Sequence, residues 1–137
     1  MITKAQFLCV MNGGKLVQHC TGHAIGYTHA IAEKSRGDED RMEYQITSTH
    51  HQMQCPYNLN RSHYDLLYTS ADMRSDRYEG LRDNFKNSIL LHGEPEIVLY
   101  HAPGKPKCLA IQGHPEMMPH DAPVCEMLRN LIDETMI

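Results

Sequence analysis

Residues 96–116 read EIVLYHAPGKPKCLAIQGHPE, and this stretch decides the fold that we expect. Residues 96–101 and 107–112 are short, largely apolar segments, which is typical of buried strands. The sequence Ala-Pro-Gly-Lys-Pro at residues 102–106 lies between them and favours a reversal of the chain. The stretch therefore predicts an antiparallel hairpin, followed at once by a polar Gln-Gly-His-Pro-Glu segment.

Helices are expected near both ends of the chain. Residues 5–11 (AQFLCVM) carry apolar side chains at helical spacing, and Asn12-Gly13-Gly14 supplies a stop. Asp121 can cap a final helix over residues 122–134, because Pro123 then falls in its first turn. The apolar stripe of this helix consists of Val124, Met127, Leu128, Leu131 and Ile132.

Several further strands are expected between these helices. They cover residues 15–18, 28–32, 43–47 and 65–69. The intervening polar segments, residues 19–27, 34–41 and 70–86, are expected to be loops or turns. Because strands alternate with helices, we expect a single α/β domain over residues 1–137, with a mixed sheet and flanking helices.

The composition is that of an ordinary globular domain. Of 137 residues, 41% are hydrophobic and 22% are charged, which argues against a disordered or fibrous chain. The net charge of −4 with no basic stripe disfavours nucleic-acid binding. The chain shows neither a leader peptide nor an apolar segment long enough to span a membrane, so we expect a cytoplasmic protein without a membrane partner. Five unevenly spaced cysteines are expected to be reduced thiols, while ten histidines are an unusually high number.

The segment at residues 112–116 carries the chemical argument. Pro115 keeps the residue before it out of the helical region, so His114 is held at the end of a strand. Glu116 can then reach one ring nitrogen of His114, fix its tautomer and support a transient positive charge. These are the base and the orienting group of a nucleophilic triad. The alternative is an ordinary turn in which the histidine and the glutamate are neighbours by chance.

Three segments together resemble the class I glutamine amidotransferases and the related γ-glutamyl hydrolases, most closely those of bacterial and phage genomes. They are the strand with QGHPE at residues 112–116, AQFLCVMNGGKLVQH at residues 5–19, and ITSTHHQ at residues 46–52. The resemblance implies part of a flavodoxin-like α/β layer. It also implies a Cys-His-Glu triad that hydrolyses the amide of glutamine and passes on the ammonia. No cofactor is implied.

The same resemblance assigns roles to individual residues. His114 would be the catalytic acid and base, and Glu116 its orienting partner. Gln6, Ser48, His50 and His51 would lie along the substrate, which is glutamine or a γ-glutamyl compound. No metal ligand belongs to this set.

The expected nucleophile is the point at which the sequence departs from the family. The family pattern Cys-x-Gly-x-Gln corresponds here to Ile2-Thr3-Lys4-Ala5-Gln6, and an isoleucine side chain cannot attack a carbonyl. The upstream strands and the nucleophile turn of the family have no counterpart. Cys9 is expected in the core, while Cys20 and Cys55 lack the strand–turn–helix context that activates a thiol. The chain alone is therefore expected to be inactive.

Three interpretations of function remain open. The chain is part of an amidotransferase whose N-terminal half or synthetase subunit is another chain, or it is a relative without a nucleophile that binds a partner. In the third interpretation it binds a metal, through His19, Cys20 and His23 or through His50, His51 and Cys55. Because a partial layer leaves strand edges and apolar faces uncovered, we expect an oligomer or a complex.

Overall fold

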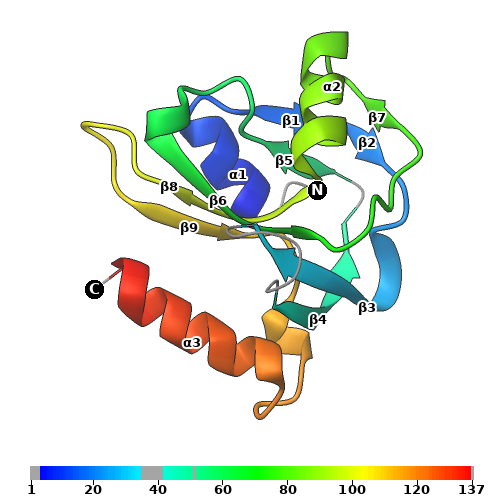
Figure 1. Ribbon diagram of the computed structural model, residues 1–137, viewed down its shortest axis with the longest axis vertical. Helices are drawn as coiled ribbons and strands as arrows, with labels where there is room; N and C mark the ends of the chain where they lie inside the picture. Colours follow the sequence, from blue (N-terminus) through cyan, green and yellow to red (C-terminus); the bar gives the residue numbers. More distant parts are fainter. Residues whose placement is uncertain (1–3, 35–41, 51, 137) are drawn as a thin grey trace.

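The fold is built on one antiparallel sheet of five strands. A computed structural model describes residues 4–34, 42–50 and 52–136, with residues 24–27 described by their backbone. The strands of the sheet lie in the order β4-β3-β6-β8-β9, and the sheet curls into a half-barrel (Figure 1). Their bounds are β3 (Ala24–Glu33), β4 (Glu43–Thr49), β6 (Tyr64–Ser70), β8 (Pro95–Tyr100) and β9 (Cys108–Ile111).

Strand β8 is the centre of the molecule, since all six of its residues are buried. It pairs antiparallel with β6 on one side and with β9 on the other. Successive side chains of a strand point to opposite faces. Val98 and Tyr100 accordingly pack in one apolar cluster, whereas Ile97 packs in another on the other face. This strand is therefore covered on both faces.

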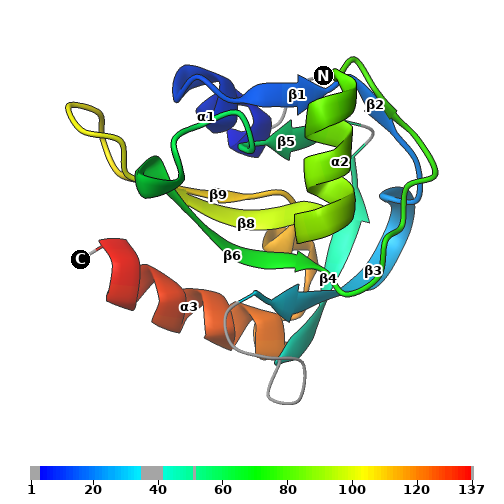
Figure 2. The same cartoon turned by 45° about the horizontal axis from the view of Figure 1, so that its top comes forward.

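Two helices supply that cover. Helix α1 (Lys4–Met11) buries Ala5 and Cys9 against Val98 and Tyr100. Helix α3 (Pro123–Met136) buries three apolar residues against the opposite face of the sheet: Val124, Met127 and Leu128. Figure 2 shows α1 and α3 on opposite sides of strands β8 and β9.

A third part of the core lies on the same side of the sheet as α1 (Figure 2). It contains helix α2 (Asp83–His92) and two short antiparallel pairs. The strands of these pairs are β1 (Lys15–Val17) with β5 (Met53–Cys55), and β2 (His19–Cys20) with β7 (Tyr78–Glu79). Short 3-10 helices, η2 (Arg61–His63) and η3 (Pro115–Met117), complete the described elements. Among the described residues, no helix combines the length and the apolar character needed to cross a membrane.

Several local predictions are confirmed. The hairpin of β8 and β9, the first helix and the last helix all form where the sequence predicts them. The expected strands at residues 15–18, 43–47 and 65–69 correspond to β1, β4 and β6. Residues 28–32 belong to the longer strand β3.

The predicted architecture is wrong. The fold is mixed α+β with a curled antiparallel sheet, and it is not a flavodoxin-like α/β layer with a mixed sheet. A parallel pair needs a long crossover connection, usually a helix, whereas β3 and β4 pair directly as consecutive strands. The supposed loop at residues 19–27 contains β2 and the start of β3, and that at residues 70–86 contains β7 and the start of α2. Most of the charged turn at residues 34–41 lies outside the described residues.

Candidate functional site

The His114 turn is attached to two strands of the sheet, β9 and β4. Strand β9 ends at Ile111, and Gln112 and Gly113 after it are buried. The backbone N–H of His114 donates a 2.8 Å hydrogen bond to the carbonyl oxygen of Thr47 at the end of β4. Pro115 then begins η3, and His114 before it has a non-helical backbone conformation (φ −119°, ψ 81°). The backbone therefore fixes where the imidazole leaves the chain.

His114 and Glu116 form the expected pair. Nδ1 of the ring lies 2.7 Å from Oε1 of Glu116, in the range of a charge-assisted hydrogen bond. Burial, the largest single effect, would raise the pKa of Glu116, but the hydrogen bond and charge of His114, with further contributions from the backbone and Lys4, together lower that pKa. Glu116 is thus an anion that accepts the Nδ1 proton. Since the side chain of His114 is 24% exposed, Nε2 is the ring nitrogen available for proton exchange.

A shallow cavity of about 300 Å³ lies beside this pair, between η3 and α3. Glu116 and Arg129 line it together with Cys125 and several apolar side chains. The Cys125 thiol points to backbone carbonyl oxygens, with Sγ 3.7 Å from the oxygen of Pro115 and 3.6 Å from that of Pro119. The Cys125 thiol is therefore turned toward the backbone of the segment that precedes α3.

The predicted substrate residues lie in the interior, unlike the surface pair. Gln6, Ser48 and His50 are all buried. Nε2 of Gln6 donates to the carbonyl oxygen of Gln52 at 2.7 Å, and Nδ1 of His50 donates to the same oxygen at 2.8 Å. The Ser48 hydroxyl donates to the carbonyl oxygen of His23 at 2.5 Å. These bonds organise the interior, while His51, Ile2 and Thr3 lie outside the described residues.

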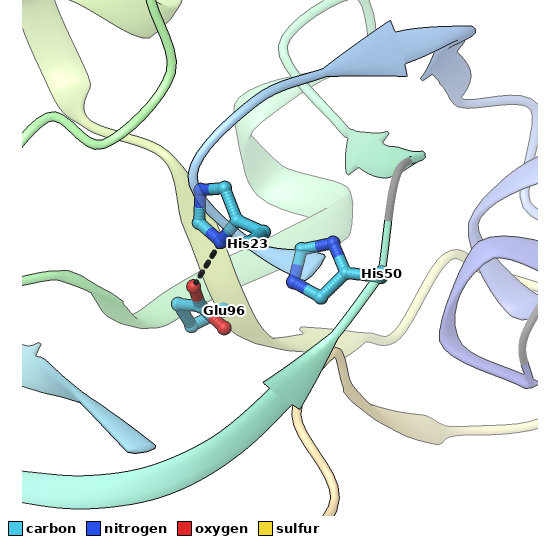
Figure 3. Close-up of side chains that lie close together, drawn as sticks. All are labelled: His23, His50 and Glu96. Carbon is cyan, nitrogen blue, oxygen red and sulfur yellow. Dashed lines mark ion pairs between the residues drawn. The ribbon is translucent and has the colours of Figure 1, made fainter. Parts of the chain in front are cut away.

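A buried cluster of histidines and glutamates was missed by the sequence analysis. His23 lies just before β3, and His29 lies in β3. His50 directly follows β4. Glu94 and Glu96 flank Pro95 at the start of β8. Nε2 of His23 lies 3.2 Å from Oε1 of Glu94, and Nδ1 of His23 lies 3.3 Å from Oε1 of Glu96. Figure 3 shows one nitrogen of His50 turned toward His23 and Glu96. Three separate parts of the chain therefore meet in one interior site.

Charge in this cluster is concentrated on His23 and the two glutamates. Burial opposes the charge on His23, but the hydrogen bond with Glu94 and the nearby negative charges of Glu94 and Glu96 raise its pKa to about 9. Burial likewise opposes the charges of both glutamates, yet His23 lowers the pKa of each. Burial lowers the pKa of His50 to about 4, so its ring is neutral. The cluster thus pairs an imidazolium with carboxylates beside a neutral imidazole.

The first predicted metal set does not form among the described residues, and the second contains His51, which lies outside them. His23 of the first set and His50 of the second set instead lie together with Glu96. The sequence held one signal for this cluster, since a glutamate at the start of a fully buried strand requires a partner for its charge. That signal identifies Glu96 but not the histidines that contact its carboxylate.

Comparisons with known proteins add no assignment. A scan against protein-family models, a search of curated proteins and a search of solved structures each gave no match to this chain. The basis for a functional assignment is therefore the chemistry of the described residues.

Proposed function

We propose that this chain supplies the acid–base pair for cysteine-dependent hydrolysis of a glutamine or γ-glutamyl amide. One observation carries the proposal, the 2.7 Å contact between Nδ1 of His114 and Oε1 of Glu116. It holds the imidazole in the tautomer whose Nε2 can accept a proton. The resemblance of residues 112–116 to the amidotransferase motif supports the choice of substrate.

The proposed reaction has two steps. Nε2 of His114 takes the proton of a cysteine thiol, the sulfur attacks the amide carbon, and the same proton leaves with ammonia. Water then attacks the γ-glutamyl thioester, with His114 again accepting a proton and returning it to the departing sulfur. In both steps Glu116 stabilises the imidazolium that forms, because its anionic oxygen already accepts the Nδ1 proton.

The thiol in this proposal comes from a polypeptide outside these 137 residues. Cys9, Cys20 and Cys55 are buried, and burial raises the pKa of each thiol, to about 12 for Cys20 and Cys55. Only the thiolate is a good nucleophile, so these cysteines are unsuited to the role. Cys125 lies near the turn, but its Sγ points to the carbonyl oxygens of Pro115 and Pro119.

Helix α1 offers a surface for that polypeptide. Phe7, Val10 and Met11 are exposed on this helix. A patch of exposed apolar side chains on one helix favours association with another protein. Lys4, at the start of α1, is near enough to Glu116 for its charge to contribute to the lowered pKa of that carboxyl. A nucleophile turn docked at the start of α1 would therefore approach His114. We expect the partner to carry a strand leading into Gly-x-Cys-x-Gly.

Mixing the chain with such a polypeptide tests the proposal. Ammonia release from glutamine should appear in the mixture and be absent from either component alone. Replacing the partner cysteine by serine should abolish the activity, whereas Cys125→Ser in this chain should leave it unchanged. Ammonia release by this chain alone, lost in Cys125→Ser, would show that the nucleophile is internal and would overturn the two-chain proposal.

A further inference from the structure

We propose that His23, His50 and Glu96 bind a divalent transition-metal cation such as Zn²⁺. One ligand atom from each residue lies within 4.8 Å of the other two, and all three side chains are buried (Figure 3). This site is separate from the His114–Glu116 pair, and the inference does not depend on the proposed function. Two imidazoles and one carboxylate form a ligand set that suits zinc or iron rather than calcium.

Each of the three proposed ligand residues has a buried polar atom without a hydrogen bond. Nε2 of His50 and Oε2 of Glu96 are buried and have no hydrogen-bond partner among the described residues. Nδ1 of His23 lies 3.3 Å from Oε1 of Glu96, but its geometry is not that of a hydrogen bond. Buried polar atoms normally find partners, so three such atoms in one place point to a ligand.

The opposite atom of each residue is held by the surrounding protein. Nδ1 of His50 donates to the carbonyl oxygen of Gln52 at 2.8 Å, which leaves a lone pair on Nε2. Nε2 of His23 is directed at Glu94, and Oε1 of Glu96 accepts a 2.8 Å hydrogen bond from the Ser70 hydroxyl. Histidines that bind a metal are usually oriented in this way, by a carbonyl or a carboxylate on the second ring nitrogen.

Charge also favours a cation at this position. Glu94 and Glu96 bring two carboxylates into the interior, and a divalent cation would neutralise both. Binding would require His23 to release its proton, so the cation competes with that proton for Nδ1. Ligand atoms around zinc lie roughly 3.3 Å apart, because Zn–N distances are about 2.0–2.1 Å. The cluster would therefore have to contract modestly around the ion.

Zinc binding tests this proposal. The protein should be stripped with a chelator and then given Zn²⁺, both in the folded state and during refolding from urea, because the ligands are buried. Isothermal titration and elemental analysis should show one Zn²⁺ per chain, and Zn²⁺ should raise the melting temperature. Co²⁺ in place of Zn²⁺ should give visible absorption bands of a site with nitrogen and oxygen ligands.

Two variants make the test specific. His50→Gln should bind Zn²⁺ at least about tenfold more weakly, since it removes a ligand while leaving His23 paired with both glutamates. His101→Gln, which removes a surface histidine next to Asp65, should bind as the wild type does. Circular dichroism must show that both variants are folded, and Ser70→Ala provides a milder change if His50→Gln unfolds. Equal Zn²⁺ affinity in the wild type, His50→Gln and Ser70→Ala, or no bound Zn²⁺ after refolding, would overturn the proposal.

Discussion

Nδ1 of His114 lies 2.7 Å from Oε1 of Glu116, and the two residues are separated only by Pro115. The proline fixes the backbone between them, and the hydrogen bond of His114 N–H to Thr47 fixes the turn to the sheet. Orientation of the imidazole is therefore a property of the backbone as much as of the side chains.

The tautomer of His114 is set by this contact. In the neutral ring the proton should reside on Nδ1, because Glu116 accepts it there. Nitrogen-15 NMR of the histidine rings should show Nε2 of His114 as the unprotonated nitrogen. In Glu116→Ala the population of the other tautomer should rise. A wild-type ring protonated mainly on Nε2 would contradict the assigned orientation.

Gly113 should resist substitution because Ile46 occupies the space of a side chain. A Cβ at position 113 would lie 2.8 Å from Cδ1 and 2.9 Å from Cγ1 of Ile46. Gly113→Ala should lower the free energy of unfolding by about 1–3 kcal/mol, the usual cost of overpacking. Urea denaturation measures this loss. The double variant Gly113→Ala/Ile46→Ala should show favourable coupling, and strictly additive effects would argue against the contact.

Tyr100 should contribute to stability through its hydroxyl. It donates a 2.8 Å hydrogen bond to Oε1 of buried Gln54. The backbone N–H of Gln54 in turn donates to Oε1 of Gln112. Tyr100→Phe would leave Oε1 of Gln54 without this donor and should cost about 1–3 kcal/mol in the free energy of unfolding. Tyr44→Phe, at a half-buried position on edge strand β4, is the control and should change it by less than about 0.5 kcal/mol. Equal losses in the two variants would refute the role of this hydrogen bond.

The five cysteines should fall into two reactivity classes. Cys108 and Cys125 are partly exposed, whereas Cys9, Cys20 and Cys55 are buried. Burial, together with the charges of Glu94 and Glu96, raises the pKa of Cys20 to about 12, and burial raises that of Cys55 to about 12. At about pH 8 both remain thiols, so iodoacetamide should modify only Cys108 and Cys125 in the folded protein. Peptide mapping that finds Cys20 or Cys55 modified at the same rate would contradict the packing.

The sequence predicts the local elements better than their arrangement. The sequence predicts the hairpin of β8 and β9 because two apolar segments flank a Pro-Gly turn. The antiparallel pairing of the other strands of the sheet is not predicted, because a strand buried on both faces has the same apolar pattern in either type of sheet. Helix α2 was missed since it begins with polar residues and buries only Ile89.

The candidate sites show the same limit. His114 and Glu116 are two residues apart, so local backbone geometry was enough to predict their contact. His23, His50 and Glu96 are distant in sequence and meet only because β3 lies between β4 and β6 and β6 lies beside β8. No local pattern contains that strand order, and so Glu96 was interpreted only as the start of a strand.

We propose that His114 acts as the acid and base for a cysteine supplied by a second polypeptide. The most direct measurement is the rate of ammonia release from glutamine by the two-chain mixture, compared between the wild type and His114→Ala at equal, saturating partner concentration. His114→Ala should lower this rate by at least about 100-fold, as expected for loss of a general acid–base group, while partner binding should be unchanged. A His114→Ala mixture that releases ammonia as fast as the wild-type mixture would contradict it.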